Sequence, residues 1–185
     1  DQFNGGQSNP TYRLTTPSAC YVLRRKPAGP VLKGAHDVLR EAQVQQALAQ
    51  TGVPVARILA ICADETIIGS AFYVMELVEG RIFWDASLAD LPSAARAPYY
   101  DEMNRVIAAL HRLDPVAVGL GTFGRPGSYF ARQIGRWSQQ YQADTLAGRD
   151  AAMDALVAWL PGAIPADDET RIVHGDFRID NLIFH

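Results

Sequence analysis

Apolar and polar positions alternate along much of the first 78 residues, and this pattern predicts a small antiparallel sheet with one helix. The expected strands are Thr11–Leu14, Tyr21–Lys26, Ile58–Ala63 and Ser70–Leu77. Turn-forming Gly, Pro, Ser and Asp residues separate these runs, as they do in hairpins. The segment Ala35–Gln50 contains neither Gly nor Pro and places apolar residues on one face, so we expect a helix there.

Beyond residue 80 the apolar positions follow helical spacing instead. Helices are expected at Leu91–Leu113, Ser128–Tyr141 and Ala151–Leu160, and short apolar strands at Ile172–Val173 and Leu182–Phe184. A sheet-rich segment followed by a mostly helical one predicts an α+β fold with two lobes. We place the lobes at residues 1–78 and 79–185.

The segment HGDFRIDN, from His174 to Asn181, is the most informative motif of the chain. It fits H-x-D-x-x-x-x-N between two expected strands, which is the catalytic-loop pattern of protein-kinase-like enzymes. In such a loop the carboxylate of Asp176 accepts the proton of a substrate hydroxyl, and the amide oxygen of Asn181 holds Mg²⁺ on a nucleotide. Arg178 lies where a cation stabilises the transferring phosphoryl group. The competing interpretation is a chance loop with Asp and Asn as turn residues.

A run of small polar residues precedes the first expected strand. It consists of Gly5, Gly6, Gln7, Ser8 and Asn9. Small residues let backbone N–H groups approach phosphate oxygens, so this run is a candidate phosphate-binding loop. It lacks the full G-x-G-x-x-G spacing, and an ordinary Gly-rich turn is the better explanation when the run is taken alone.

A cation and a carboxylate are expected to pair near that loop. Strand alternation places Arg24 and Lys26 on the same face. Kinase-like folds use a strand cation for the nucleotide phosphates and pair it with a helix Glu. Arg24 is the preferred candidate and Lys26 its rival, with a solvated basic strand end as the plain alternative. Glu41 is the candidate partner, because Asp37 is better explained as a first-turn residue favoured by the helix dipole.

The segment FYVMELVEG, from Phe72 to Gly80, is an apolar strand that runs into Glu-Gly. In a two-lobed kinase the adenine ring contacts the backbone of such a connecting segment. The main-chain groups of Glu76 and Val78 are therefore candidate nucleotide contacts, although a plain buried strand also explains the apolar residues. Residues 1–78 would then be a nucleotide-binding lobe, and residues 79–185 an incomplete catalytic lobe.

Charge and composition restrict the possible partners. The net charge is −3, and no basic stripe argues for nucleic acid. No apolar run approaches the ~20 residues of a membrane span. Cys20 and Cys62 cannot make a disulfide framework and have no metal-ligand spacing, so we expect a reduced, cytoplasmic setting. The chain begins without Met and stops after an apolar segment, and we interpret it as part of a longer protein; the oligomeric state stays open.

These residues resemble the aminoglycoside phosphotransferase-like branch of the kinase-like superfamily, which carries HGD where protein kinases carry HRD. They are most similar to the kinase-like domain of acyl-CoA dehydrogenase family members 10 and 11 and its bacterial relatives. The resemblance spans almost the whole chain. The matching stretches are Gln2–Tyr12, Tyr21–Pro27, Phe72–Trp84, Phe123–Gln133 and His174–His185, of which YFARQ and HGDFRIDN are the specific ones.

The resemblance implies a bilobal protein-kinase-like fold and ATP- and Mg²⁺-dependent transfer of a phosphoryl group to a small-molecule hydroxyl, with a hydroxyacyl-CoA as a candidate acceptor. Asp176 would be the catalytic base and Asn181 a metal ligand. The family's second metal-binding Asp lies in a D-W-E-like segment just downstream of Phe184. The 185 residues alone are therefore expected to be poor catalysts, because Mg²⁺ favours charged oxygen ligands.

Two alternatives stay open. One is a non-catalytic nucleotide-binding module, a pseudokinase, which the Arg at the strand-cation position favours. The other keeps phosphoryl transfer but changes the acceptor to an aminoglycoside or an amino-alcohol.

Overall fold

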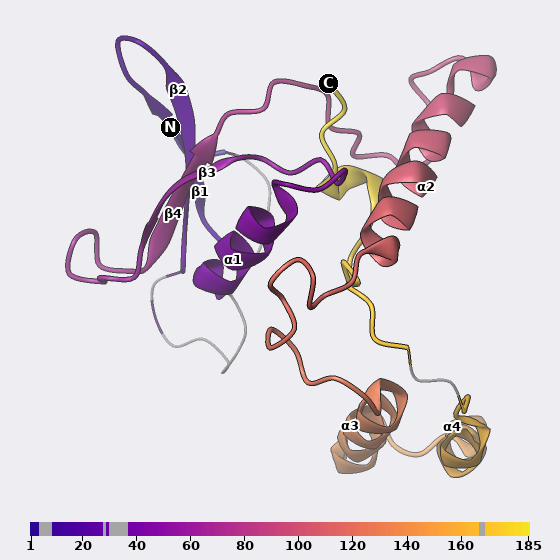
Figure 1. The fold of residues 1–185 in the computed structure, drawn as a ribbon. Coiled ribbons are helices and arrows are strands. Elements are labelled where there is room, and N and C mark those ends of the chain that lie inside the picture. The colour runs from indigo at the N-terminus through magenta and orange to yellow at the C-terminus, as the bar shows by residue number, and fades with distance from the viewer. Residues whose placement is uncertain (4–8, 28, 30–36, 167–168) are drawn as a thin grey trace. The chain divides into compact units, whose positions relative to one another are not determined.

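The computed structural model describes residues 1–3, 9–27, 29, 37–166 and 169–185. Its sheet contains β1 (Thr11–Thr15), β2 (Cys20–Arg25), β3 (Ile58–Cys62) and β4 (Phe72–Glu76). The strands lie in the order β1-β2-β4-β3, and every neighbouring pair is antiparallel. Figure 1 labels the four strands and the helices. All four expected strands form, each within a few residues of its predicted bounds.

Helix α1 (Val38–Leu48) lies within the expected helical segment. It begins after Asp37, whose carboxylate accepts a hydrogen bond from the Arg40 N–H at 3.1 Å, so Asp37 is the N-cap. The helix packs on the sheet through a buried cluster. The members of that cluster are Val38, Ala42, Ala71 and Tyr73.

Helix α2 (Ala97–Arg112) is shorter than the predicted Leu91–Leu113. A 3₁₀ turn at Ser93–Ala95 precedes it, and Pro98 lies in its first turn. Proline lacks an N–H donor and is tolerated only in the first turn, so the chain upstream of Pro98 cannot continue the same helix.

The predicted strand at Ile172–Val173 is wrong, because no strand is assigned there and Val173 is exposed. A 3₁₀ turn, η3 (Ile179–Asn181), follows instead. The predicted strand at Leu182–Phe184 is reduced to a single antiparallel bridge between Phe184 and Arg81. Both backbone hydrogen bonds of that bridge form, at 2.8 and 2.9 Å. Among the described residues this segment pairs only through that bridge, so no longer ladder forms.

Two compact units divide the described chain: Asp1–Leu113 with Ile172–His185, and Asp114–Arg171. The sheet, α1, α2 and the HGDFRIDN segment all belong to the first unit. The expected lobe boundary at residue 78 falls inside that unit, and the lobes as drawn from the sequence stay a prediction.

The second unit contains α3 (Tyr129–Ala143), α4 (Ala151–Trp159) and a 3₁₀ turn, η2 (Leu160–Ala163). The Tyr141 hydroxyl joins the two helices, because it accepts from the Asp150 N–H at 2.8 Å and lies 3.0 Å from the Asp154 carboxylate. Asp150 caps α4 by accepting from the Met153 N–H.

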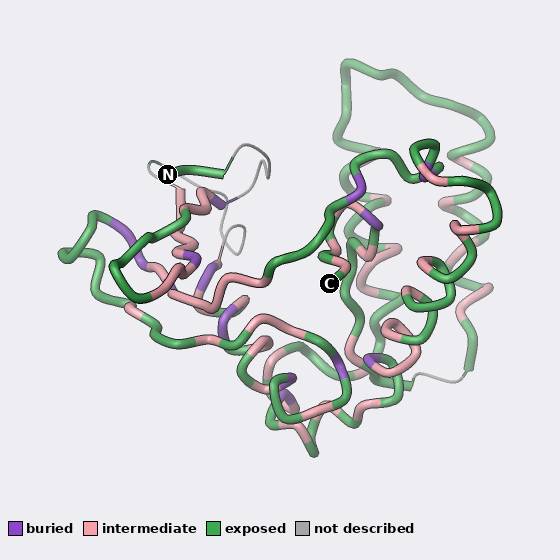
Figure 2. The backbone as a smooth tube through the Cα atoms, turned by 90° about the horizontal axis from the view of Figure 1, so that it is seen from above, coloured by how far each residue is buried: buried purple, intermediate pink, exposed green. Residues whose placement is uncertain are grey.

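The buried residues among those described form small separate clusters rather than one continuous core. Along the backbone in Figure 2 the buried residues appear as short, scattered stretches. The first cluster lies between α1 and the sheet. The second joins Leu48 and Val53 to Leu110 of α2, and the third surrounds Ile179. No helix in the described part of the chain is long and apolar enough to cross a membrane.

Candidate active site

The carboxylate of Asp176 and the amide of Asn181 lie side by side. The Asn181 Nδ2 donates to Asp176 Oδ2 and to the Asp176 carbonyl oxygen, both at 2.9 Å. Gly175 lies between His174 and Asp176 with φ +83°, a backbone conformation that favours glycine over any residue with a Cβ. The Asp176 side chain is 62% exposed, so it is open to a ligand.

Arg178 lies between two carboxylates of the same loop. Its Nε is 3.2 Å from Asp176 Oδ1, and its Nη2 is 2.9 Å from Asp180 Oδ2. The guanidinium is itself 62% exposed. The structure therefore brings the three predicted catalytic-loop residues together: a carboxylate, a cation and an amide. Their chemical roles stay predictions.

Apolar packing anchors this exposed loop from one side. Ile179 is 3% exposed and packs with Phe83 and Leu88. The rings of Phe83, Tyr99 and Phe184 pack edge to face around them, with centroids 4.9–5.6 Å apart. The loop is thus held by its buried neighbours, while its polar groups face outward.

Gly80 permits the close approach that the bridge between Arg81 and Phe184 requires. A Cβ added at Gly80 would lie 2.5 Å from the Phe184 carbonyl oxygen and 2.6 Å from the Ile183 side chain. A residue larger than glycine at this position therefore conflicts with the segment that follows the catalytic loop.

Arg24 and Glu41 form the predicted ion pair. The Arg24 Nε lies 2.7 Å from Glu41 Oε2, and its Nη1 donates to the Thr11 hydroxyl at 3.0 Å. Two further donors reach the same carboxylate: Asn9 Nδ2 at 2.6 Å from Oε1 and the Tyr73 hydroxyl at 3.3 Å from Oε2. The pairing of strand cation and helix carboxylate is confirmed, and its contact with nucleotide stays a prediction.

Lys26, the rival strand cation, has a different partner. Its Nζ lies 3.5 Å from Glu65 Oε1, and both side chains are exposed. A long, exposed ion pair of this kind restrains a lysine only weakly. Of the candidate phosphate-binding loop, Gly5, Gly6, Gln7 and Ser8 lie outside the described residues.

Burial changes the acid–base behaviour of Tyr73. Desolvation, with the nearby Glu41 carboxylate, raises the pKa of Tyr73 to about 12. Its hydroxyl is therefore neutral at physiological pH and donates to Glu41, while it accepts from Gln45 Nε2 at 3.1 Å. Sequence reasoning missed Thr11, Tyr73 and Gln45. Gln45 could have been found, because it lies one helical turn after Glu41.

The positions of Thr11 and Tyr73 beside Arg24 depend on strand register. Thr11 and Tyr73 are the direct partners of Arg24 on the two neighbouring strands. Sequence alternation identifies the face on which Arg24 lies but not which residues stand opposite it. Nothing in the local pattern around either residue signals a role beside a cation.

Glu76 and Val78, the candidate nucleotide contacts of the connecting segment, differ in whether their backbone N–H is free. The Glu76 N–H donates to the Arg57 carbonyl at 3.0 Å, and the Glu76 carboxylate accepts from the Arg57 N–H at 2.9 Å. The N–H of Val78 has no hydrogen-bond partner among the residues described. An adenine contact requires a free donor of this kind, which fits the prediction for Val78; the Glu76 N–H is already engaged.

Few side chains of the site could bind a divalent cation. In the described ranges no group of three or more His, Cys, Asp or Glu residues could hold a metal ion. Asn181 donates through Nδ2, so its Oδ1 faces away from Asp176 and is a possible ligand. Mg²⁺ in nucleotide sites often takes only one or two protein oxygens, together with phosphates and water, so these donors fit it.

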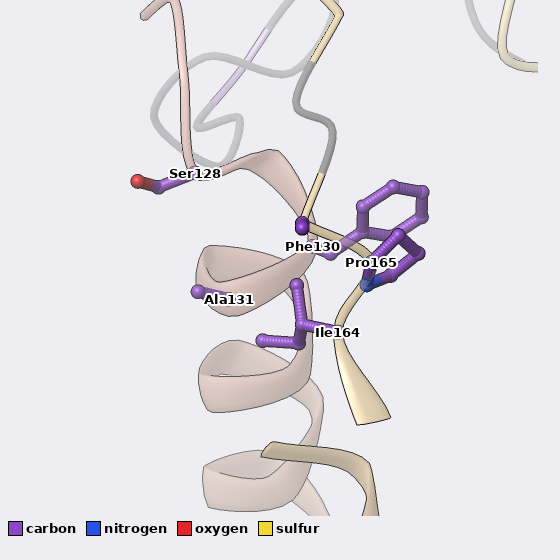
Figure 3. Close-up of a pocket in the computed structure, with 6 residues that line it drawn as sticks. Ser128, Phe130, Ala131, Ile164 and Pro165 are labelled. Atoms are coloured by element: carbon purple, nitrogen blue, oxygen red, sulfur yellow. The ribbon is translucent and has the colours of Figure 1, made fainter. Parts of the chain in front are cut away.

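The cavities of the second unit were not predicted from the sequence. One of about 210 Å³ lies between α3 and the chain after η2, with Phe130, Ile164 and Pro165 among its lining residues (Figure 3). A second of about 280 Å³ shares Ala131 and Ile164 with it. Small residues recur along α3 at Ala131, Gly135 and Ser138, and that spacing was the available signal.

Known proteins are similar to this chain in sequence, and solved structures are similar to it in fold. Acyl-CoA dehydrogenase family member 10 of Mus musculus is 45% identical over 184 residues, which is 100% of this chain and 17% of that protein. A Ralstonia eutropha crystal structure assigned to the aminoglycoside phosphotransferases is 52% identical with a TM-score of 0.88, and this chain spans 54% of it. The GDP complex of aminoglycoside 2'-phosphotransferase-IIIa is 19% identical with a TM-score of 0.69, over 100% of this chain and 60% of that one.

The antiparallel sheet and its helices thus have the α+β, kinase-like fold of these phosphotransferases, and the chain covers only part of each relative. Residues 1–185 match the phosphotransferase enzyme family along their whole length. The chain belongs to that phosphotransferase family.

Proposed function

We propose that the protein containing these residues is an ATP- and Mg²⁺-dependent phosphotransferase that acts on the hydroxyl of a small molecule, with a hydroxyacyl-CoA as its acceptor. The observation that carries the proposal is the contact between Asp176 and Asn181 at 2.9 Å within H-x-D-x-x-x-x-N. This arrangement pairs a base for the acceptor hydroxyl with an amide beside it.

The roles of the loop residues follow from their chemistry. Asp176 accepts the proton of the acceptor hydroxyl as its oxygen attacks the terminal phosphorus, and the bond from that phosphorus to the nucleoside diphosphate breaks. Arg178 offsets the negative charge on the phosphoryl oxygens. Asn181 would hold Mg²⁺ through Oδ1, and the ion would neutralise the phosphates when bound.

The nucleotide side rests on the ion pair of the sheet. Arg24 is held by Glu41 in one orientation, which suits a cation that meets phosphate oxygens. Val78 would contribute its N–H to the adenine edge. The GDP bound by a structurally similar phosphotransferase supports a nucleoside phosphate as the donor, and ATP is our choice among the nucleotides.

The acceptor is inferred from the relatives. The mouse relative is named an acyl-CoA dehydrogenase family member, which favours an acyl-CoA that carries a hydroxyl group. The Ralstonia eutropha structure supports an aminoglycoside or amino-alcohol as the second candidate. A polycationic acceptor of that class requires an acidic pocket, whereas an acyl-CoA carries negative phosphates, so the two classes make opposite electrostatic demands.

An acceptor panel with the full-length protein tests this proposal. ADP release from ATP and Mg²⁺ is measured with hydroxyacyl-CoAs, the corresponding CoAs without the hydroxyl, aminoglycosides and amino-alcohols. We expect turnover only with the hydroxylated acyl-CoAs, and its loss in Asp176→Asn. Asp101→Asn on the surface of α2 is the matched control and should keep full turnover.

Turnover with an aminoglycoside and not with a hydroxyacyl-CoA would favour the second candidate acceptor class. ATP binding that ignores Mg²⁺, without phosphoryl transfer to any acceptor, would favour a pseudokinase module.

A further inference from the structure

Asn9 is buried in an unusual way. It is 2% exposed, and its Nδ2 donates to Glu41 Oε1 at 2.6 Å. Its Oδ1 is buried without any hydrogen-bond partner. Among the side-chain polar atoms of the described residues, only Asn9 Oδ1 and Ser70 Oγ are in that position. Buried polar atoms are nearly always satisfied, so each exception calls for a physical explanation.

Stability does not explain Asn9. A buried amide oxygen without a donor destabilises the fold relative to an apolar side chain of similar size, such as leucine. The benefit of the residue must therefore come from its other end, the Nδ2 that holds Glu41.

The contacts of Glu41 show what that Nδ2 does. Oε2 receives Arg24 Nε and the Tyr73 hydroxyl, while Asn9 Nδ2 is the shortest contact of Oε1. Gln45 holds the Tyr73 hydroxyl in turn. With donors on both oxygens, the carboxylate cannot rotate away from the guanidinium, and charge-assisted bonds of this kind are directional.

We propose that Asn9 is a positioning residue, which orients the Arg24 guanidinium toward the nucleotide phosphates by fixing Glu41. The inference rests on the proposed function, because it requires that Arg24 meets a nucleotide. Preorganisation of the cation lowers the ordering that binding demands, so the effect belongs to nucleotide affinity rather than to the chemical step. Tyr73 supports the same carboxylate from its second oxygen.

The test compares variants of the two residues that carry a buried polar atom without a partner, Asn9 and Ser70, in the full-length protein. Asn9→Leu removes the donor to Glu41, and Ser70→Ala removes the other buried atom without a partner, which makes no hydrogen bond to the ion pair. The dissociation constant of ATP with Mg²⁺, the KM for ATP, kcat and Tm are measured for both. We expect Asn9→Leu to weaken ATP binding about tenfold, as the loss of one charge-assisted hydrogen bond predicts, with kcat within threefold and Tm no lower.

Ser70→Ala should leave ATP affinity unchanged. ATP affinity within twofold of wild type in a folded Asn9→Leu, while Asp176→Asn still abolishes turnover, would overturn the inference and leave the proposed function standing. If Asn9→Leu does not fold, Tyr73→Phe decides, because it keeps the ring and removes only the hydroxyl: unchanged ATP affinity there rejects the positioning network. A wild-type protein that binds no ATP defeats the proposed function itself.

Discussion

The Arg24–Glu41 pair and the Asp176–Asn181 loop are built in opposite ways. Glu41 receives donors on both carboxylate oxygens from the buried Asn9 and Tyr73 and the partly exposed Arg24. Asp176 is largely exposed, and the hydrogen bonds and ion pair that it makes with described residues all lie within its own loop. A group that binds a phosphate benefits from a fixed orientation, whereas a group that takes a proton must be reachable by the substrate. The difference predicts that mutations in the first region change affinity and mutations in the second change turnover.

The largest effect is expected at Asp176. Asp176→Asn keeps the size of the side chain but removes the proton acceptor, and kcat should fall by about two to four orders of magnitude. The dissociation constant of ATP should stay within threefold. Steady-state kinetics and calorimetric titration measure the two quantities, and a variant that loses ATP affinity as much as turnover would contradict the division between the regions.

Loss of the apolar anchor should be the next largest effect. Ile179→Ala leaves a cavity among Phe83 and Leu88 and should lower the free energy of unfolding by about 2–4 kcal/mol. Urea denaturation of the full-length protein measures this. Ile183→Ala, in the same segment but 45% exposed, is the matched control and should change stability by less than about 1 kcal/mol.

Tyr73 gives the buried region a distinct pH dependence. The pKa of Tyr73 is about 12 in the folded protein and near its ordinary 10.0 when unfolded. The folded state therefore binds this proton more tightly; the contribution is complete below pH ~10 and is lost as pH rises toward ~12, on the order of 2 kcal/mol. We expect the Tyr73→Phe variant to lose less unfolding free energy between pH ~9.5 and ~12, the range spanned by these two pKa values. Denaturation curves at several pH values measure this. An unchanged decline would mean that other groups cause it.

The smallest effect separates the two candidate cations. Glu41→Gln keeps the shape of the carboxylate and removes its charge, and we expect ATP affinity to fall about tenfold through a less ordered Arg24. Glu65→Gln removes the partner of Lys26 in the same way and should leave ATP affinity within twofold. The reverse order of effects would make Lys26 the phosphate cation.

Much of the fold was predictable because it depends on local pattern. The four strands, the α1 helix and the HGDFRIDN motif follow from alternation, helical spacing and a fixed spacing of Asp and Asn along one short loop. One failure has a local cause, because Pro98 stops the predicted extension of α2 toward Leu91. The other does not: Ile172–Val173 pairs with no strand among the described residues, and such pairing depends on distant parts of the chain.

The residues of the candidate site also differ in whether a local pattern could predict them. Asp176 and Asn181 are five residues apart, so one loop brings them together and the sequence alone was enough to identify them. The contacts of Glu41 come from separate strands and a helix. Only the pairing of β1, β2 and β4 decided that Thr11 and Tyr73 stand opposite Arg24. Only the tertiary structure buries Asn9 so that its Nδ2 bonds Glu41 while its Oδ1 has no partner. Register and burial arise from contacts distant in the chain, which no local pattern encodes.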